Sequence, residues 1–204
     1  MMKRFFTLCA LCFTVSVALA QPVKSITYTQ EENLALNNLM LLLDVQSLHI
    51  KITGTFSGKI LRIVEHVVEN GQETVMPIGD TFTNIGSTLY FSILSRWLPD
   101  DYVQILIIPG AKPGQRVTSI SSTFSMNNRE TYVLMETFPA NNVFPENDIP
   151  LIAFTHGIEI SMEINDRFYQ NFDQNRLRES HVSPNLWPHL FGINHFVYYT
   201  LRFE

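Results

Sequence analysis

The stretch LIAFTHGIEISMEI, residues 151–164, decides the fold class, because apolar and polar side chains alternate along it. The apolar positions of one face are Ile152, Phe154, Ile158, Ile160, Met162 and Ile164. Glu159, Ser161 and Glu163 lie on the opposite face, since successive side chains of a strand alternate. One face meets a core and the other meets water, which predicts a half-buried strand of an antiparallel sheet.

Strand-like runs of similar length recur along most of the chain. They are residues 48–56, 59–69, 73–78, 89–94, 102–108, 117–124, 131–138 and 196–203. Between the second and third of these runs, Asn70-Gly71 is a strong signal for a two-residue hairpin turn. The chain is therefore predicted to be all-β, an antiparallel β-sandwich of roughly 8–10 strands.

Two helical segments interrupt this pattern. A short N-terminal helix is expected near residues 30–44, where Thr29 precedes Glu32 as in a capping box and leucines follow at helical spacing. The leucines lie all around this segment, which favours a helix packed against a sheet on more than one side, or else a buried strand. A small helical or irregular segment is expected near residues 166–190, before the last strand.

Residues 1–20 have the three parts of a cleavable secretory signal peptide. Lys3 and Arg4 form a basic start, an apolar run follows, and the run ends at Ala20 in an Ala-x-Ala-like cleavage site. We therefore expect an exported protein, in the periplasm or at the cell surface, most simply of a Gram-negative bacterium. The remaining residues, 21–204, have the size of one domain and are expected to form a single β-sandwich domain.

Cleavage would change both the cysteine content and the charge. Cys9 and Cys12 are the two cysteines of the chain, so the mature protein would have no thiol for disulfides, metal sites or nucleophilic catalysis. It would keep 12 basic and 19 acidic residues, a formal charge of −7, which disfavours nucleic acid as a partner. We expect no stable membrane span once the signal peptide is removed.

The C-terminal run raises two alternatives. Its aromatic residues, Phe196, Tyr198, Tyr199 and Phe203, resemble those of the closing strand of an outer-membrane β-barrel. Runs such as residues 102–108 lack the alternation that lipid-facing strands need, so a barrel is the less favoured architecture. The run from His195 to Phe203 is also long and weakly charged, and as an edge strand it could mediate self-association.

Aromatic residues in turn-rich stretches are the best binding signal. Trp97 is followed closely by Asp100 and Asp101, and Trp187 by His189. Exposed rings beside polar groups suit stacking on sugars, whereas the alternative role for each tryptophan is a lid over the core. A Pro-Asp-Asp turn leading into a strand is the favoured explanation of the adjacent aspartates.

Histidines are the other candidates. His156 lies in the apolar pattern of residues 151–164 beside Gly157, a candidate bulge that could direct the imidazole into a site, although a histidine satisfied at the core edge explains it too. His181, His189 and His195 lack the spacing of metal ligands. We therefore expect neither a metal nor another cofactor.

These observations favour an exported, non-catalytic binding or structural module, with carbohydrate or another exported protein as the partner. The alternative is an exported hydrolase or metal-dependent enzyme that uses the histidines with nearby acids.

Overall fold

The computed structural model describes residues 23–83, 86–110, 119–126, 131–137, 148–164 and 167–204. The expected signal peptide lies outside them. Within these ranges, no helix has both the length and the apolar character that a membrane span requires.

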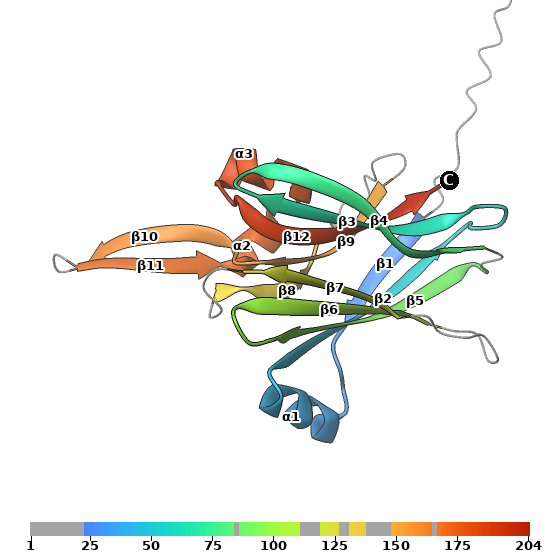
Figure 1. Cartoon of the computed structure of the whole chain (residues 1–204), viewed down its shortest axis with the longest axis horizontal. Coiled ribbons are helices and arrows are strands. Elements are labelled where there is room, and N and C mark those ends of the chain that lie inside the picture. The colour runs from blue at the N-terminus through green and yellow to red at the C-terminus, as the bar shows by residue number, and fades with distance from the viewer. Residues whose placement is uncertain (1–22, 84–85, 111–118, 127–130, 138–147, 165–166) are drawn as a thin grey trace, which may run out of the picture.

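Two antiparallel sheets of five strands each dominate the described part of the chain (Figure 1). The first sheet has the order β1 (Val23–Thr29), β2 (Val45–Gly54), β5 (Thr88–Trp97), β6 (Tyr102–Pro109), β7 (Ile120–Ser125). The second has the order β4 (Gln72–Phe82), β3 (Leu61–Glu69), β12 (His195–Phe203), β9 (Asp148–Thr155), β8 (Val133–Glu136). One apolar cluster draws residues from both sheets, so the two sheets form a sandwich.

Side chains from alternate positions fill the space between the sheets. Ile50 and Ile105 of the first sheet and Ile63 and Leu201 of the second are almost completely buried there. Complete burial of such a side chain stabilises the fold by about 1.5–3 kcal/mol. The Tyr28 hydroxyl also crosses the layer and donates to the Leu151 carbonyl at 2.8 Å. The main core therefore lies where the alternating pattern of the strands places it.

A third layer covers part of the outer face of the second sheet. It contains α2 (Gln174–Glu179), the short 3-10 helix η2 (Pro184–Leu186) and α3 (Trp187–Phe191). Between β9 and this layer, the chain forms a protruding two-stranded ribbon of β10 (Ile158–Ile164) and β11 (Arg167–Asp173) (Figure 1). Leu177 and Trp187 from this layer form a second apolar cluster with residues of the sheet such as Phe196. The second sheet therefore has apolar contacts on both faces.

The run at residues 151–164 is not one strand, and this part of the prediction is wrong. It divides at His156-Gly157 into β9, in the second sheet, and β10, in the ribbon. Gly157 has φ +81°, a left-handed conformation that ends the extended chain. β9 is buried on both faces rather than one, because the second sheet is covered on both sides.

The predicted all-β antiparallel sandwich is confirmed, with corrections in its details. Twelve strands lie in the described ranges instead of roughly 8–10, since β1 and β11 were not predicted and the run above forms two strands. The hairpin at Asn70-Gly71 is present, with φ +52° and +75°. The N-terminal helix is α1 (Leu34–Leu42), although Asn33, rather than Thr29, is its N-cap.

The C-terminal strand β12 is a central strand, which contradicts the prediction of an exposed edge. It pairs with β3 on one side and with β9 on the other. Both rows of its backbone groups are therefore used inside the sheet, and self-association by edge pairing through this strand is wrong.

Gly157→Ala should destabilise the protein strongly. A Cβ at this position would lie 2.8 Å from the backbone carbon of Asp173 and 2.8 Å from the nitrogen of Gln174, in addition to the strain of φ +81°. We expect a loss of about 2–4 kcal/mol in the free energy of unfolding, measured by urea denaturation.

Gly58→Ala is the matched control, because Gly58 has φ +72° but its Cβ would meet no atom within 4 Å. It should cost only the backbone strain, about 1 kcal/mol. Equal losses in the two variants would show that the contact with β11 and α2 is not what requires glycine at position 157.

Candidate functional site

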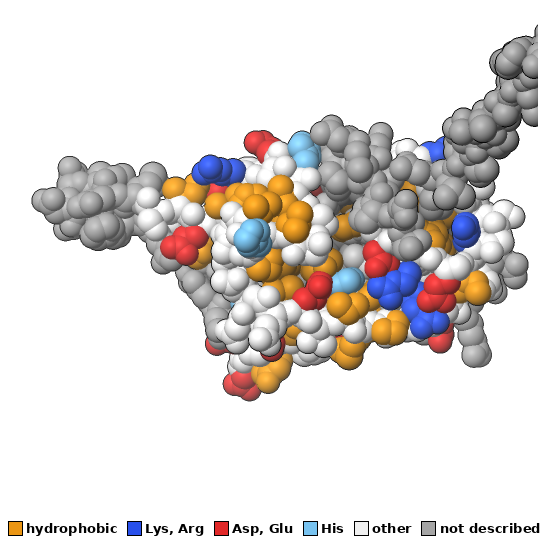
Figure 2. Space-filling model, turned by 90° about the horizontal axis from the view of Figure 1, so that it is seen from above, with side chains coloured by type: hydrophobic (Ala, Val, Ile, Leu, Met, Phe, Trp, Pro, Cys, Tyr) orange, Lys and Arg blue, Asp and Glu red, His pale blue; other side chains and the backbone are white. Residues whose placement is uncertain are grey.

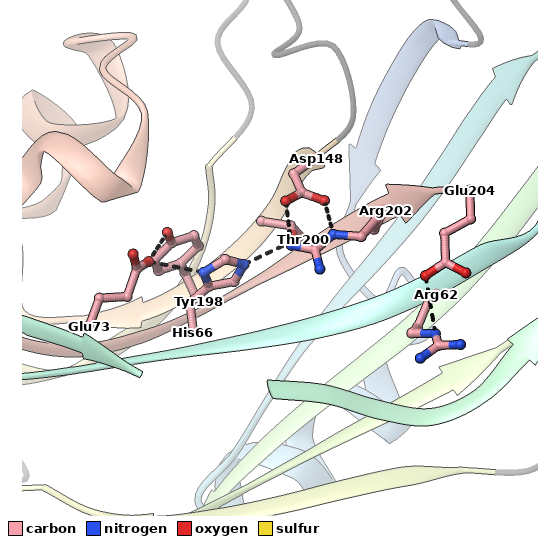
Figure 3. Close-up of polar contacts among 8 residues, drawn as sticks. All are labelled: Arg62, His66, Glu73, Asp148, Tyr198, Thr200, Arg202 and Glu204. Atoms are coloured by element: carbon pink, nitrogen blue, oxygen red, sulfur yellow. Dashed lines mark hydrogen bonds and ion pairs between the residues drawn. The ribbon is translucent and has the colours of Figure 1, made fainter. Parts of the chain in front are cut away.

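A polar network lies on the outer face of the second sheet, built by three neighbouring strands (Figure 3). β3 contributes His66, β4 contributes Glu73, and β12 contributes Tyr198 and Thr200. His66 is paired in register with Tyr198, and Val68 with Glu73. Because residues two apart on a strand share a face, His66 and Glu73 are diagonal neighbours across the hairpin.

His66 connects a carboxylate to a hydroxyl. Its Nδ1 lies 2.9 Å from Glu73 Oε1, and its Nε2 lies 3.1 Å from Thr200 Oγ1. The tautomer with the proton on Nδ1 satisfies both contacts, since it donates to Glu73 and accepts from Thr200. The Tyr198 hydroxyl donates to the same Glu73 oxygen, and its ring stacks on the imidazole with a centroid separation of 4.2 Å. The network therefore joins an acid, an imidazole and a hydroxyl in series.

Burial determines the charge states in this network. It lowers the pKa of His66, and the hydrogen bond and negative charge of Glu73 oppose this effect without cancelling it. Burial also raises the pKa of Tyr198 far above its usual range, assisted by the hydrogen bond to Glu73 and by its charge. At neutral pH, His66 is therefore a neutral imidazole and Tyr198 a protonated donor.

Charged pairs continue the polar strip along β12 (Figure 3). Arg202 holds Asp148 by two parallel hydrogen bonds, both 2.7 Å long. Further along, Arg62 Nε lies 3.6 Å from Glu204 Oε1. Figure 2 shows acidic, basic and histidine side chains gathered on this face. Each acid of the two pairs has a basic partner within the strip.

The chemical capacity of the network is limited by access to its hydroxyl. A neutral imidazole oriented by a carboxylate can act as a general base toward an adjacent hydroxyl. Thr200, however, has only 2% of its surface exposed. The arrangement is therefore that of a base and a nucleophile, but the hydroxyl is enclosed.

Trp97, Asp100 and Asp101 lie around the turn between β5 and β6. Trp97 is partly buried against the main core, and its ring packs edge-on against Phe154 with centroids 5.7 Å apart. Asp100 and Asp101 are exposed and have φ +61° and +58°, the conformation of a tight hairpin turn. These three residues complete a turn and its packing.

Trp187 and His189 lie in a different layer, on α3. Trp187 is 1% exposed, packs on Phe196, and its Nε1–H donates to the Val182 carbonyl at 2.8 Å. His189 is exposed. The structure does not bring the two tryptophans together, and Trp187 presents no ring face for stacking on a sugar.

His156 lies where β9 ends, enclosed by aromatic rings. Tyr132 and Phe172 contact it edge-on, with centroids 5.3 and 4.9 Å from the imidazole. Its Nδ1 is buried and has no hydrogen bond of good geometry. Burial lowers the pKa of His156; a backbone hydrogen bond at Gly157 and the charge of Glu159 oppose this effect without cancelling it, and His195 adds a smaller lowering. The structure thus brings His195, but neither His181 nor His189, close to His156.

Within the described ranges, no three or more His, Cys, Asp or Glu side chains converge in a way that could hold a metal ion.

Helix α1 is the feature that sequence reasoning misjudged. Asn33 caps it by accepting from the backbone N–H groups of Ala35 and Leu36, each at 3.1 Å. Met40 is its buried residue, whereas the leucines on the remaining sides face solvent. The exposed leucines are Leu34 (72%), Leu36, Leu39, Leu41 (70%), Leu42 (81%) and, at the C-cap, Leu43.

This exposure contradicts the expected packing of the helix against a sheet on more than one side. In Figure 1, α1 projects from the sandwich beyond the first sheet. Residues 34–43 contain no charged side chain, while Glu31, Glu32 and Asp44 flank them. An apolar helix of this kind is normally buried, and a contiguous exposed apolar surface typically marks an interaction site.

Comparisons of the chain with family models, with curated proteins and with solved structures find no match.

The stability of the protein should fall as the pH decreases below about 6.5. Because the pKa of His66 in the folded state lies below the value of 6.5 in the unfolded state, the unfolded chain binds the proton first. The free energy of unfolding should therefore decrease between pH 7.5 and 5.5, with a slope approaching 1.4 kcal/mol per pH unit for each such group.

Urea denaturation of His66→Gln and His156→Gln at pH 7.5, 6.5 and 5.5 measures this effect, since burial lowers the pKa of both histidines. Each variant should show a flatter pH dependence than the wild type. His189→Gln, at an exposed position on α3, should keep the wild-type dependence. A wild-type slope unchanged in both buried variants would contradict the assignment of neutral histidines.

Proposed function

We propose that this chain is an exported, non-catalytic binding or structural protein that recognises another protein, with α1 as its recognition element. The exposed leucines of α1 are the observation that carries the proposal. Burial of a leucine contributes about 1.5–3 kcal/mol, so Leu34, Leu41 and Leu42 together offer a large driving force for association. Such a gain is available only to a partner that covers the helix.

The chemistry of α1 favours a protein partner over a carbohydrate. Leucine side chains offer neither hydrogen bonds nor flat aromatic faces, which are the contacts that sugars use. A leucine-rich helix instead fits an apolar groove, in the manner of helix-in-groove recognition. Trp187, part of the sugar-binding hypothesis, is the buried residue of α3 and has no exposed ring.

Export is the second part of the proposal. It rests on the basic and apolar pattern of residues 1–20 and on the cleavage site at Ala20. We place the mature protein in the periplasm or at the cell surface. There the sandwich acts as a rigid scaffold that holds α1 away from the two sheets.

Hydrolysis is a second candidate, favoured by the series Glu73–His66–Thr200. The two distances, 2.9 and 3.1 Å, are those of a base in contact with its orienting acid and its nucleophile. The substrate class would be an ester or another activated acyl compound. Enclosure of Thr200 is the reason that binding is the preferred function.

The binding function is tested by replacing Leu42 with the photo-cross-linker p-benzoylphenylalanine in the organism that makes the protein. A discrete cross-linked product should appear, because Leu42 is 81% exposed on the recognition helix. It should be absent when the cross-linker replaces Asp80, an exposed residue of β4, and lost when Leu34→Gln and Leu41→Gln are added.

Mass spectrometry of the exported protein should show removal of residues 1–20. If the protein binds to a glycan array and no protein cross-links at Leu42, the proposed partner is a carbohydrate and the protein partner is wrong.

The hydrolytic candidate predicts labelling of the protein by a fluorophosphonate. Labelling should disappear in Thr200→Val and in His66→Gln and persist in Thr123→Val, which alters an exposed threonine of β7. Absence of labelling in the wild type, together with no hydrolysis of p-nitrophenyl esters, would remove this candidate.

A further inference from the structure

The outer face of the first sheet is polar where β1, β2 and β5 lie side by side. The inner positions of these strands, such as Ile50 and Phe91, belong to the main core, so the alternate positions point away from it. Strand register pairs nine of these outward positions into three rows, which we call the hydroxyl grid. The rows are Ser25, Thr53 and Thr88; Thr27, Lys51 and Tyr90; and Thr29, His49 and Ser92. Six of the nine side chains are therefore small hydroxyls.

Tyr90 provides the flat aromatic surface of the hydroxyl grid. The residue is 53% exposed, and Lys51 Nζ lies over its ring, 6.0 Å from the centroid. Residue 110, after the end of β6, is glycine, and a Cβ there would lie 2.6 Å from Tyr90 Cβ. Because glycine has no side chain, Gly110 covers neither face of the ring. An exposed ring of this kind can stack on the apolar C–H face of a sugar.

Hydrogen bonds orient several polar groups of the grid. Ser25 Oγ and Thr53 Oγ1 are 2.7 Å apart, and His49 Nδ1 lies 3.0 Å from Ser92 Oγ. A hydroxyl both donates and accepts, so each of these groups keeps hydrogen-bonding capacity for a ligand. The bonds also restrict the side chains before a ligand binds, which reduces the entropy cost of binding.

The strands of the first sheet contain no acidic residue, although the chain as a whole is acidic. None of the 19 aspartates and glutamates lies in β1, β2, β5, β6 or β7, whereas four strands of the second sheet contain at least one. Lys51 is at the centre of the grid, and no acid in the described part of the chain forms an ion pair with it. Glu31 reaches one corner, where its Oε2 lies 3.6 Å from His49 Nε2. The centre of the grid therefore favours an anionic group.

This combination of groups fits a saccharide better than other anionic partners. Serine and threonine contribute little affinity in protein interfaces, where larger apolar and aromatic side chains dominate. Nucleic acid requires several cations along its backbone, and the grid has one lysine. Three strands and three outward positions on each cover about 10 by 13 Å, an area that accommodates a short oligosaccharide.

We propose that the hydroxyl grid binds an acidic oligosaccharide, a chain of sugars that carry carboxylates. Tyr90 stacks on a sugar ring, Lys51 pairs with a carboxylate, and the surrounding serines and threonines bind sugar hydroxyls. The inference goes beyond the proposed function, because it assigns a second ligand to a surface that contains no residue of α1. The two are therefore tested independently.

An array of galacturonate, alginate, hyaluronate and sialic acid oligosaccharides, each beside its carboxyl-methylated form, tests the inference. The exported protein should bind at least one acidic oligosaccharide and bind the neutral methyl ester roughly 10-fold more weakly, since the ester cannot pair with Lys51. Polyglutamate, an acidic polymer without sugar rings, should bind more weakly than that oligosaccharide.

Variants with matched controls locate the binding surface. Tyr90→Ala and Lys51→Met should each weaken binding of the selected oligosaccharide roughly 10-fold. The controls are Tyr102→Ala, at a 44% exposed tyrosine of β6 outside the grid, and Lys59→Met, at an exposed lysine. Both controls should keep the wild-type affinity.

Three results would overturn the inference. They are binding to no acidic oligosaccharide of the array, equal binding of polyglutamate, and equal effects of the grid variants and their controls.

Cross-linking at Leu42 separates the inference from the proposed function. A protein that cross-links there but binds no oligosaccharide would overturn the hydroxyl grid and leave protein recognition by α1 standing. Oligosaccharide binding that persists in the α1 variant Leu34→Gln with Leu41→Gln, without any cross-link in the wild type, would support the grid and contradict protein recognition by α1.

Discussion

Burial of β12 and β9 on both faces is the constraint on which the remaining structure depends. One face of these strands is covered by the first sheet, and part of the other is covered by α2 and α3. Hydrogen bonding to neighbours on both sides places β12 at the centre of the second sheet. The ribbon of β10 and β11 is the connection that carries the chain from β9 to the covering helices, and Gly157 provides the change of direction at its base.

The same double burial explains the polar network. A polar group removed from water must find a partner inside the protein, and the buried Tyr198, His66 and Thr200 each have one, with the exposed Glu73 as the partner of the first two. Burial lowers the pKa of His66 despite the nearby Glu73, so the sheet holds a neutral imidazole at this position. The network therefore stabilises the register of β3, β4 and β12 whether or not it has a chemical role.

Helix α1 differs from the strands, because most of its apolar side chains are exposed. Its leucines remain in water while comparable side chains of the strands are buried, and nothing within the described part of the chain covers them. Solvent exposure of these leucines costs free energy in the isolated molecule and is recovered only on association. Association through α1 would thus cover an apolar surface that folding leaves open.

The local pattern of the sequence determined the class of the fold, the hairpin at Asn70-Gly71 and the existence of α1, because each depends on neighbouring residues and on their allowed dihedral angles. The pairing of His66 with Glu73 could also have been derived, since the two-residue turn sets their register. Only the tertiary structure decided that Thr200, 134 residues beyond His66, completes the network, because its position depends on the pairing of β12 with β3. Likewise, the leucines of α1 were expected to be buried, and the sequence left open whether the ring of Trp187 stacks on a sugar or covers the core; the leucines are exposed and the ring is enclosed. A sequence pattern indicates which side chains are apolar. Which segment covers those side chains is determined by contacts between distant parts of the chain or between molecules.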